Sequence, residues 1–213
     1  MAEERTEAFR SAQNLFNKDQ VNDALEAIAP YTSDKETELT PTEMTTFAMI
    51  LSEKITGAAF EEKKDVCNEA IDRLEGVKLV KDTTWISAYG DVLYETFSKM
   101  NRCARDEERD NAWCRLKEVY IEVLMVAKKV WKEKNDPERL QLYLMLSKLC
   151  KSYLDVADEE TIKMCEDAAK EAKFVGKGTL EDDEWKDANK AIEDIKKNCS
   201  AALHEKELLK DSD

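Results

Sequence analysis

The sequence predicts an all-α protein, an antiparallel array of about nine helices that forms a single domain over residues 1–213. Glycine occurs only five times and proline three times among the 213 residues, which leaves few turn signals. Charged residues make up 38% of the chain, as expected for solvent-exposed helix faces. Both observations argue against β-sheets.

Apolar residues recur with helical spacing in nine successive segments. These segments cover residues 4–16, 19–30, 41–58, 66–74, 85–100, 113–131, 137–153, 158–174 and about 181–203. The first two are expected to form an N-terminal hairpin over 4–33, and residues 204–213 a mobile acidic tail.

Two helix starts carry strong signals. Thr40 as N-cap, Pro41 in the first turn and Glu43 three residues after Thr40 form a capping box. Asp136 followed by Pro137 repeats the N-cap and first-turn pattern.

The helix ends are marked mainly by glycine. Gly57 is the only break signal between the third and fourth segments, so the sequence leaves open where one helix ends and the next begins. Gly76 is expected near the end of the fourth helix and Gly176 at the end of the eighth, after which Thr179 can cap the last helix.

The net charge argues against nucleic-acid and membrane partners, and the targeting signals bear on location. The formal net charge of −14 repels nucleic-acid phosphates and anionic membranes, so neither is an expected partner. The sequence shows no signal peptide and no apolar run long enough for a membrane span. We therefore expect a cytoplasmic protein.

The sequence offers almost no catalytic chemistry. His204 is the only histidine, near the end of the last helix, where a solvated surface side chain is the simpler interpretation. No Gly-rich phosphate loop or metal-ligand motif is present. The six cysteines are widely spaced and are predicted to be reduced, mostly core-facing thiols. We expect no enzymatic activity, no metal and no cofactor.

Five segments, in the same order, resemble the 14-3-3 family. They are ELTPTEMTTFAMILSEKITGA at 38–58, KDVCNEAIDRLE at 64–75, WISAYGDVLYETF at 85–97, residues 119–154 and DEWKDANKAIEDIKKNCSAAL at 183–203. Residues 119–154 include the family's Pro-x-Arg-Leu helix start at Pro137, Arg139 and Leu140. The resemblance implies a cup of helices, with those starting near 41, 85, 137 and 181 lining a groove for an extended phosphoserine or phosphothreonine peptide.

The family grips the phosphate with two arginines, a lysine and a tyrosine, which suits a dianion. Here the Arg-Tyr pair of the family's Gly-Asp-Tyr-Tyr-Arg-Tyr motif falls on Tyr94 and Glu95. The lysine of the third helix falls on Ser52 or Glu53, depending on a one-residue register choice. Because a carboxylate repels phosphate, the resemblance predicts a disabled phosphate pocket.

The remaining arginine of that pocket falls on Ala59 or Phe60, or in a gap. Other residues are expected to lie along the peptide groove. They are Leu144, Met145 and Lys148 on the seventh helix and Ala191, Asp194 and Asn198 on the last. Asn198 keeps the family's peptide-binding asparagine, although a polar side chain capping a core edge explains it equally well.

The chain also lacks roughly thirty family residues between the third and fourth helices. Those residues belong to the surface on which the partner subunit's first two helices pack in the family. Dimerisation in the family manner is therefore not expected. The apolar side of the 4–33 hairpin must then fold back on its own chain or pair differently.

The predicted function is a 14-3-3-type adaptor that binds protein or peptide clients, with phosphate dependence weakened or lost. One alternative is an ordinary phosphopeptide adaptor with relocated basic residues such as Lys54 or Lys148. A remote alternative is an enzyme, which would need an enclosed pocket of perturbed ionisable groups.

Overall fold

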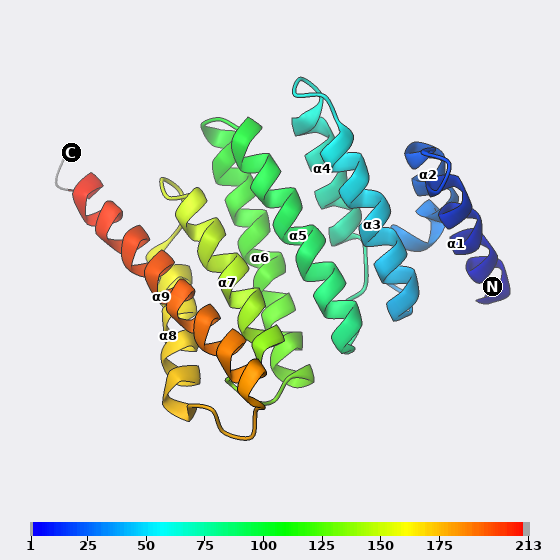
Figure 1. Cartoon of the computed structure of the whole chain (residues 1–213). Coiled ribbons are helices and arrows are strands. Elements are labelled where there is room, and N and C mark those ends of the chain that lie inside the picture. Colours follow the sequence, from blue (N-terminus) through cyan, green and yellow to red (C-terminus); the bar gives the residue numbers. More distant parts are fainter. Residues whose placement is uncertain (1, 211–213) are drawn as a thin grey trace. The chain divides into compact units, whose positions relative to one another are not determined.

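The computed structural model describes residues 2–210, drawn in Figure 1. Within this range the chain forms nine α-helices and no strands, which confirms the predicted all-α helical array. The helices fall into two compact units with the boundary between Ala104 and Arg105. The prediction of a single domain over 1–213 stays a prediction.

The first unit consists of an N-terminal hairpin and a three-helix group. Its helices are α1 (Ala2–Phe16), α2 (Val21–Thr32), α3 (Pro41–Gly57), α4 (Lys63–Glu75) and α5 (Thr83–Cys103). Helix α4 runs antiparallel to α3 and α5, and α3 packs extensively against α5 (Figure 1). Since α4 contacts both helices, it covers one side of the α3–α5 pair.

The predicted helix starts at residues 40 and 136 are confirmed. The Thr40 side chain accepts a hydrogen bond from the Glu43 N–H at 3.3 Å. The Glu43 carboxylate accepts from the Thr40 N–H at 2.7 Å, which completes the capping box. The Asp136 side chain accepts from the Glu138 N–H at 3.0 Å.

The boundary between the third and fourth helices, open in the sequence, is a short turn. Helix α3 ends at Gly57 and α4 begins at Lys63. At the other end of α4, Gly76 lies beside the end of α2. A Cβ on Gly76 would stand 3.2 Å from the Thr32 carbonyl oxygen, so glycine permits this close approach.

The N-terminal hairpin folds back on its own chain. Phe9, Leu25 and Ile28 are buried, and the Arg5 guanidinium donates to the Glu43 carboxylate at 2.9 Å. Of the two arrangements that the sequence left open, the structure therefore has the hairpin covered by α3 of the same unit.

The second unit, described as far as residue 210, contains four helices. They are α6 (Glu107–Val130), α7 (Pro137–Ser152), α8 (Glu159–Val175) and α9 (Asp182–Lys210). Three of them, α7, α8 and α9, form a group similar to that of α3, α4 and α5. Helices α7 and α9 pack extensively, and α8 contacts both. Helix α6 also packs on α7.

The last helix starts close to the predicted position near 181, but its cap and its C-terminal end differ from the prediction. It begins at Asp182, and the Glu181 N–H donates to the Glu184 carboxylate at 2.8 Å. Thr179 is therefore not the cap, because it lies too far upstream. Residues 204–210, assigned to the tail, are helical, and the expected mobile end 211–213 lies outside the described residues.

The cysteine prediction is confirmed in the main. Four thiols are buried, whereas Cys103 is half-buried and Cys114 exposed. Burial is the largest influence on the Cys67 thiol and raises its pKa to about 12, because the thiolate is poorly solvated there. Within residues 2–210, no helix is both long and apolar enough to cross a membrane.

Replacing Thr40 by alanine should lower the free energy of unfolding by about 1 kcal/mol, because the Glu43 N–H loses its acceptor. Urea denaturation followed by circular dichroism measures this change. Thr40→Ser, which keeps the hydroxyl, should remain close to wild type. Equal stability of the two variants would show that the cap contributes nothing.

Candidate functional site

The surface between α3 and α5 is hollowed on one side. The hollow has a volume of about 250 Å³. Its lining consists of Thr45, Ala48, Met49 and Ser52 on α3 and Ala88, Asp91, Val92 and Glu95 on α5. On each helix these residues follow the spacing i, i+3, i+4, i+7, which is one helical face. We call this feature the α3–α5 hollow.

The Glu95 carboxylate is held by two hydroxyl groups from the facing helix. One oxygen accepts a hydrogen bond from Ser52 Oγ, and the other accepts from Thr56 Oγ1 at 2.9 Å. Both acceptor oxygens are thus engaged, which fixes the carboxylate against α3.

The lining of the α3–α5 hollow carries negative but no positive charge. Asp91 and Glu95 are its two acidic residues, and it contains no lysine or arginine. A phosphate entering the hollow would meet like charge at short range, which disfavours binding.

Ser52 and Glu53, the two positions that the resemblance offers for the family's lysine, line different depressions of the surface. Ser52 lines the α3–α5 hollow and bonds Glu95, whereas exposed Glu53 lines a different depression among α2, α3 and α4. Ser52 is therefore the α3 residue that faces α5.

The other predicted pocket positions are not brought into the hollow. Phe60 lies in the turn after α3 and is 71% exposed. Ala59 lies in the same turn, because α3 ends at Gly57. Tyr94 is half-buried on α5 and does not line the hollow.

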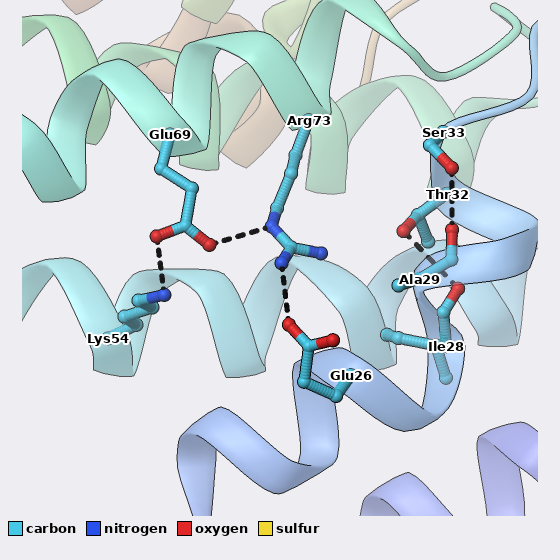
Figure 2. Close-up of polar contacts among 8 residues, drawn as sticks. All are labelled: Glu26, Ile28, Ala29, Thr32, Ser33, Lys54, Glu69 and Arg73. Carbon is cyan, nitrogen blue, oxygen red and sulfur yellow. Dashed lines mark hydrogen bonds and ion pairs between the residues drawn. The ribbon is translucent and has the colours of Figure 1, made fainter.

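Lys54 points to α4, within a chain of ion pairs shown in Figure 2. Its Nζ lies 2.6 Å from the Glu69 carboxylate, and the second Glu69 oxygen accepts from Arg73 Nε at 3.0 Å. Arg73 also reaches Glu26 of α2 at 3.3 Å (Figure 2). These contacts join α2, α3 and α4 and engage the Lys54 charge.

In the second unit, the predicted groove residues lie on α7 and α9, two helices that pack together. Leu144, Met145 and Ala191 are buried, Lys148 is exposed, and Asp194 and Asn198 are half-buried. The Asn198 amide donates to Ser147 Oγ at 3.1 Å. That bond fits the structural interpretation of Asn198, because the side chain links the two helices.

A comparison with known protein families places part of this chain in a family. Residues 33–154, more than half of the chain, match the model of a domain of unknown function, DUF7758. The chain belongs to this family. No curated protein matches it.

The family segment contains the whole α3–α5 hollow and the ion pair between Lys54 and Glu69. It ends just after α7, so it includes only one helix of the α7–α9 pair. The matched segment therefore includes every lining residue of the α3–α5 hollow, but only part of the predicted groove between α7 and α9.

Sequence reasoning missed several residues that line the hollow, among them Thr45 and Met49, and it also missed Thr56, which bonds Glu95. The signal was available in the repeated i, i+3, i+4, i+7 stripe of small and polar residues on α3. Without the position of α5, however, nothing distinguished that stripe from an ordinary solvated face.

The ion pairs of Glu69 give unfolding a defined pH dependence. Partial burial of the carboxyl raises its pKa, but hydrogen bonds and charges from Lys54 and Arg73 outweigh burial and lower the pKa from 4.5. The resulting stabilisation is present above the unfolded value and is lost as the pH falls through the lowered folded value.

Glu69→Gln should therefore destabilise the protein at pH 7, with a smaller difference from wild type at pH 3. Urea unfolding at the two pH values tests this. Glu53→Gln, an exposed position one residue before Lys54, serves as the control and should be close to neutral. A Glu69→Gln effect that is equal at both pH values would exclude the ion pairs as its cause.

Proposed function

We propose that this chain is a non-catalytic adaptor of 14-3-3 type that binds an extended segment of a client protein without requiring a phosphate. The observation that carries the proposal is the Glu95 carboxylate, held by Ser52 and Thr56 in the α3–α5 hollow. It occupies a position at which the 14-3-3 resemblance expects a phosphate-gripping residue.

The geometry of the hollow supports a peptide as its occupant. Ala48, Ala88 and Val92 provide an apolar floor, and Met49 is 48% exposed at its edge. A methionine adapts to different apolar side chains because it is unbranched and flexible. Such a surface suits an uncharged stretch of a client.

The contacts of Lys54 weigh against phosphate binding through relocated basic residues. Lys54 is ion-paired with Glu69 and lies on the side of α3 that faces α4. Lys148, the other basic residue considered for phosphate binding, is exposed on α7.

The folded-back hairpin supports an adaptor that does not dimerise in the 14-3-3 manner. Phe9 and Ile28 are already buried within the first unit, so the hairpin has little apolar surface left for a second subunit. We place this adaptor in the cytoplasm as part of the proposal.

Phosphorylation should not strengthen the binding of a 14-3-3 consensus peptide, because Asp91 and Glu95 repel the phosphate. Isothermal titration of the phosphoserine peptide and its serine counterpart measures the ratio of affinities. Glu95→Gln should shift that ratio toward the phosphopeptide, whereas Glu53→Gln, outside the hollow, should not. Micromolar binding that disappears on dephosphorylation would contradict the proposal.

Filling the hollow should block client binding. Ala88 is half-buried in the lining, and Ala88→Arg would place a long side chain over the apolar floor. A photo-crosslinker at Met49 should then capture fewer clients, whereas Phe60→Ala, in the exposed turn, should leave capture unchanged. Undiminished capture by a folded Ala88→Arg protein would exclude the hollow as the binding site.

A further inference from the structure

A larger hollow in the second unit lies among the end of α6, the start of α7 and α8. Its volume is about 740 Å³, within the range of small-molecule sites. Four basic side chains line it: Lys128 on α6, Lys134 in the α6–α7 loop, Arg139 on α7 and Lys163 on α8. We call it the α6–α8 hollow.

Arg139 is the buried member of this group. It is 8% exposed, and its Nη1 donates to the carbonyl oxygens of Trp131 at 3.3 Å and Lys132 at 3.4 Å. Its Nε is buried and has no hydrogen-bond partner among the described residues. Two neutral carbonyls compensate only part of a full positive charge, and a buried guanidinium ordinarily has an anionic partner.

Three acidic residues also line the hollow, and each of them lies near a lysine other than Lys128. Glu171 lies 3.1 Å from Lys134, Asp167 lies 3.7 Å from Lys170, and Glu160 lies 3.8 Å from Lys117.

Within residues 2–210, no carboxylate lies within 4.0 Å of the charged nitrogens of Arg139 or Lys128. Four basic and three acidic side chains line the hollow, so the excess of positive charge is small and is centred on Arg139 and Lys128.

The wall of the hollow is fixed by a buried amide. Asn135, next to Lys134, is 2% exposed. Its Nδ2 donates to the carbonyl oxygens of Gly176 at 2.7 Å and Lys177 at 3.1 Å. Those bonds tie the α6–α7 loop to the end of α8, so the basic residues are held on opposite sides of one space.

We propose that the α6–α8 hollow binds an oxyanion, the phosphate or carboxylate group of a small ligand, between Arg139 and Lys128. A guanidinium is suited to two oxygens of one anionic group, and an ammonium adds a charge without fixing direction. Lys163, whose Nζ lies 3.7 Å from the Glu159 carboxylate on the same helix, adds a third positive charge from α8. The inference does not rest on the proposed adaptor function, because none of these residues belongs to the α3–α5 hollow.

The test is a titration of the full-length protein with sodium phosphate, and separately with sodium acetate, at ionic strength held constant with sodium chloride. Nuclear magnetic resonance of backbone amides should show saturable shifts near residues 128–139 and 163–167. A response to phosphate alone identifies a phosphate site, and a response to acetate at similar concentration identifies a site for either group.

Lys128→Ala should raise the apparent dissociation constant about tenfold, because a direct charge-assisted contact is lost. Lys129→Ala is the matched control, since Lys129 is the exposed neighbour outside the lining. It should change the constant less than about twofold, as expected for screened charges. Arg139→Gln should abolish the response, and if that variant fails to fold, Lys163→Ala replaces it with an expected several-fold weakening.

Two results would overturn the proposal. One is the absence of a saturable response to both anions. The other is an equal loss in Lys128→Ala and Lys129→Ala, which would mean that the anion responds to general surface charge and not to this hollow.

Discussion

The packing of α3 against α5 is the constraint on which the first unit depends. Helix α4 contacts both members of this pair, and the α3–α5 hollow combines small and apolar residues with polar and acidic ones. Ser52 and Thr56 supply hydroxyl donors to the half-buried Glu95 carboxylate. Those hydrogen bonds hold the Glu95 carboxylate against α3, and Glu95 and Asp91 are the two acidic residues of the hollow.

The charged residues on the two sides of α3 have different kinds of partner. Toward α4, Lys54 is matched by Glu69, which Arg73 in turn connects to the hairpin. Toward α5, the Glu95 carboxylate meets neutral hydroxyl groups. Since partly buried charges with partners are tolerated better than charges without them, Lys54 is best stabilised on the side of α4. Positions 54 and 52 therefore differ in surroundings, since Lys54 is paired toward α4 and Ser52 is bonded to α5.

Local signals in the sequence predicted most of the fold, and the candidate site only in part. The starts at Thr40 and Asp136 could be predicted because a cap is a contact between near neighbours in the chain. Position 95 could be named in advance, but its bonds could not, because they join residues about forty positions apart. The cap of the last helix was misassigned because Thr179 is a good cap by type, whereas the helix begins at Asp182 and the Glu181 N–H is bonded by Glu184.

The charge of each hollow illustrates why sequence composition says little about local binding. A chain with a net charge of −14 still leaves Arg139 and Lys128 without carboxylate partners among its described residues, because the nearby acids are engaged by other lysines. An anion in the hollow responds to the charges nearest to it and to whether they are already paired, since charges beyond about 10 Å are largely screened by salt. An acidic protein can thus contain both a hollow that repels oxyanions and a hollow whose residues are arranged to receive one.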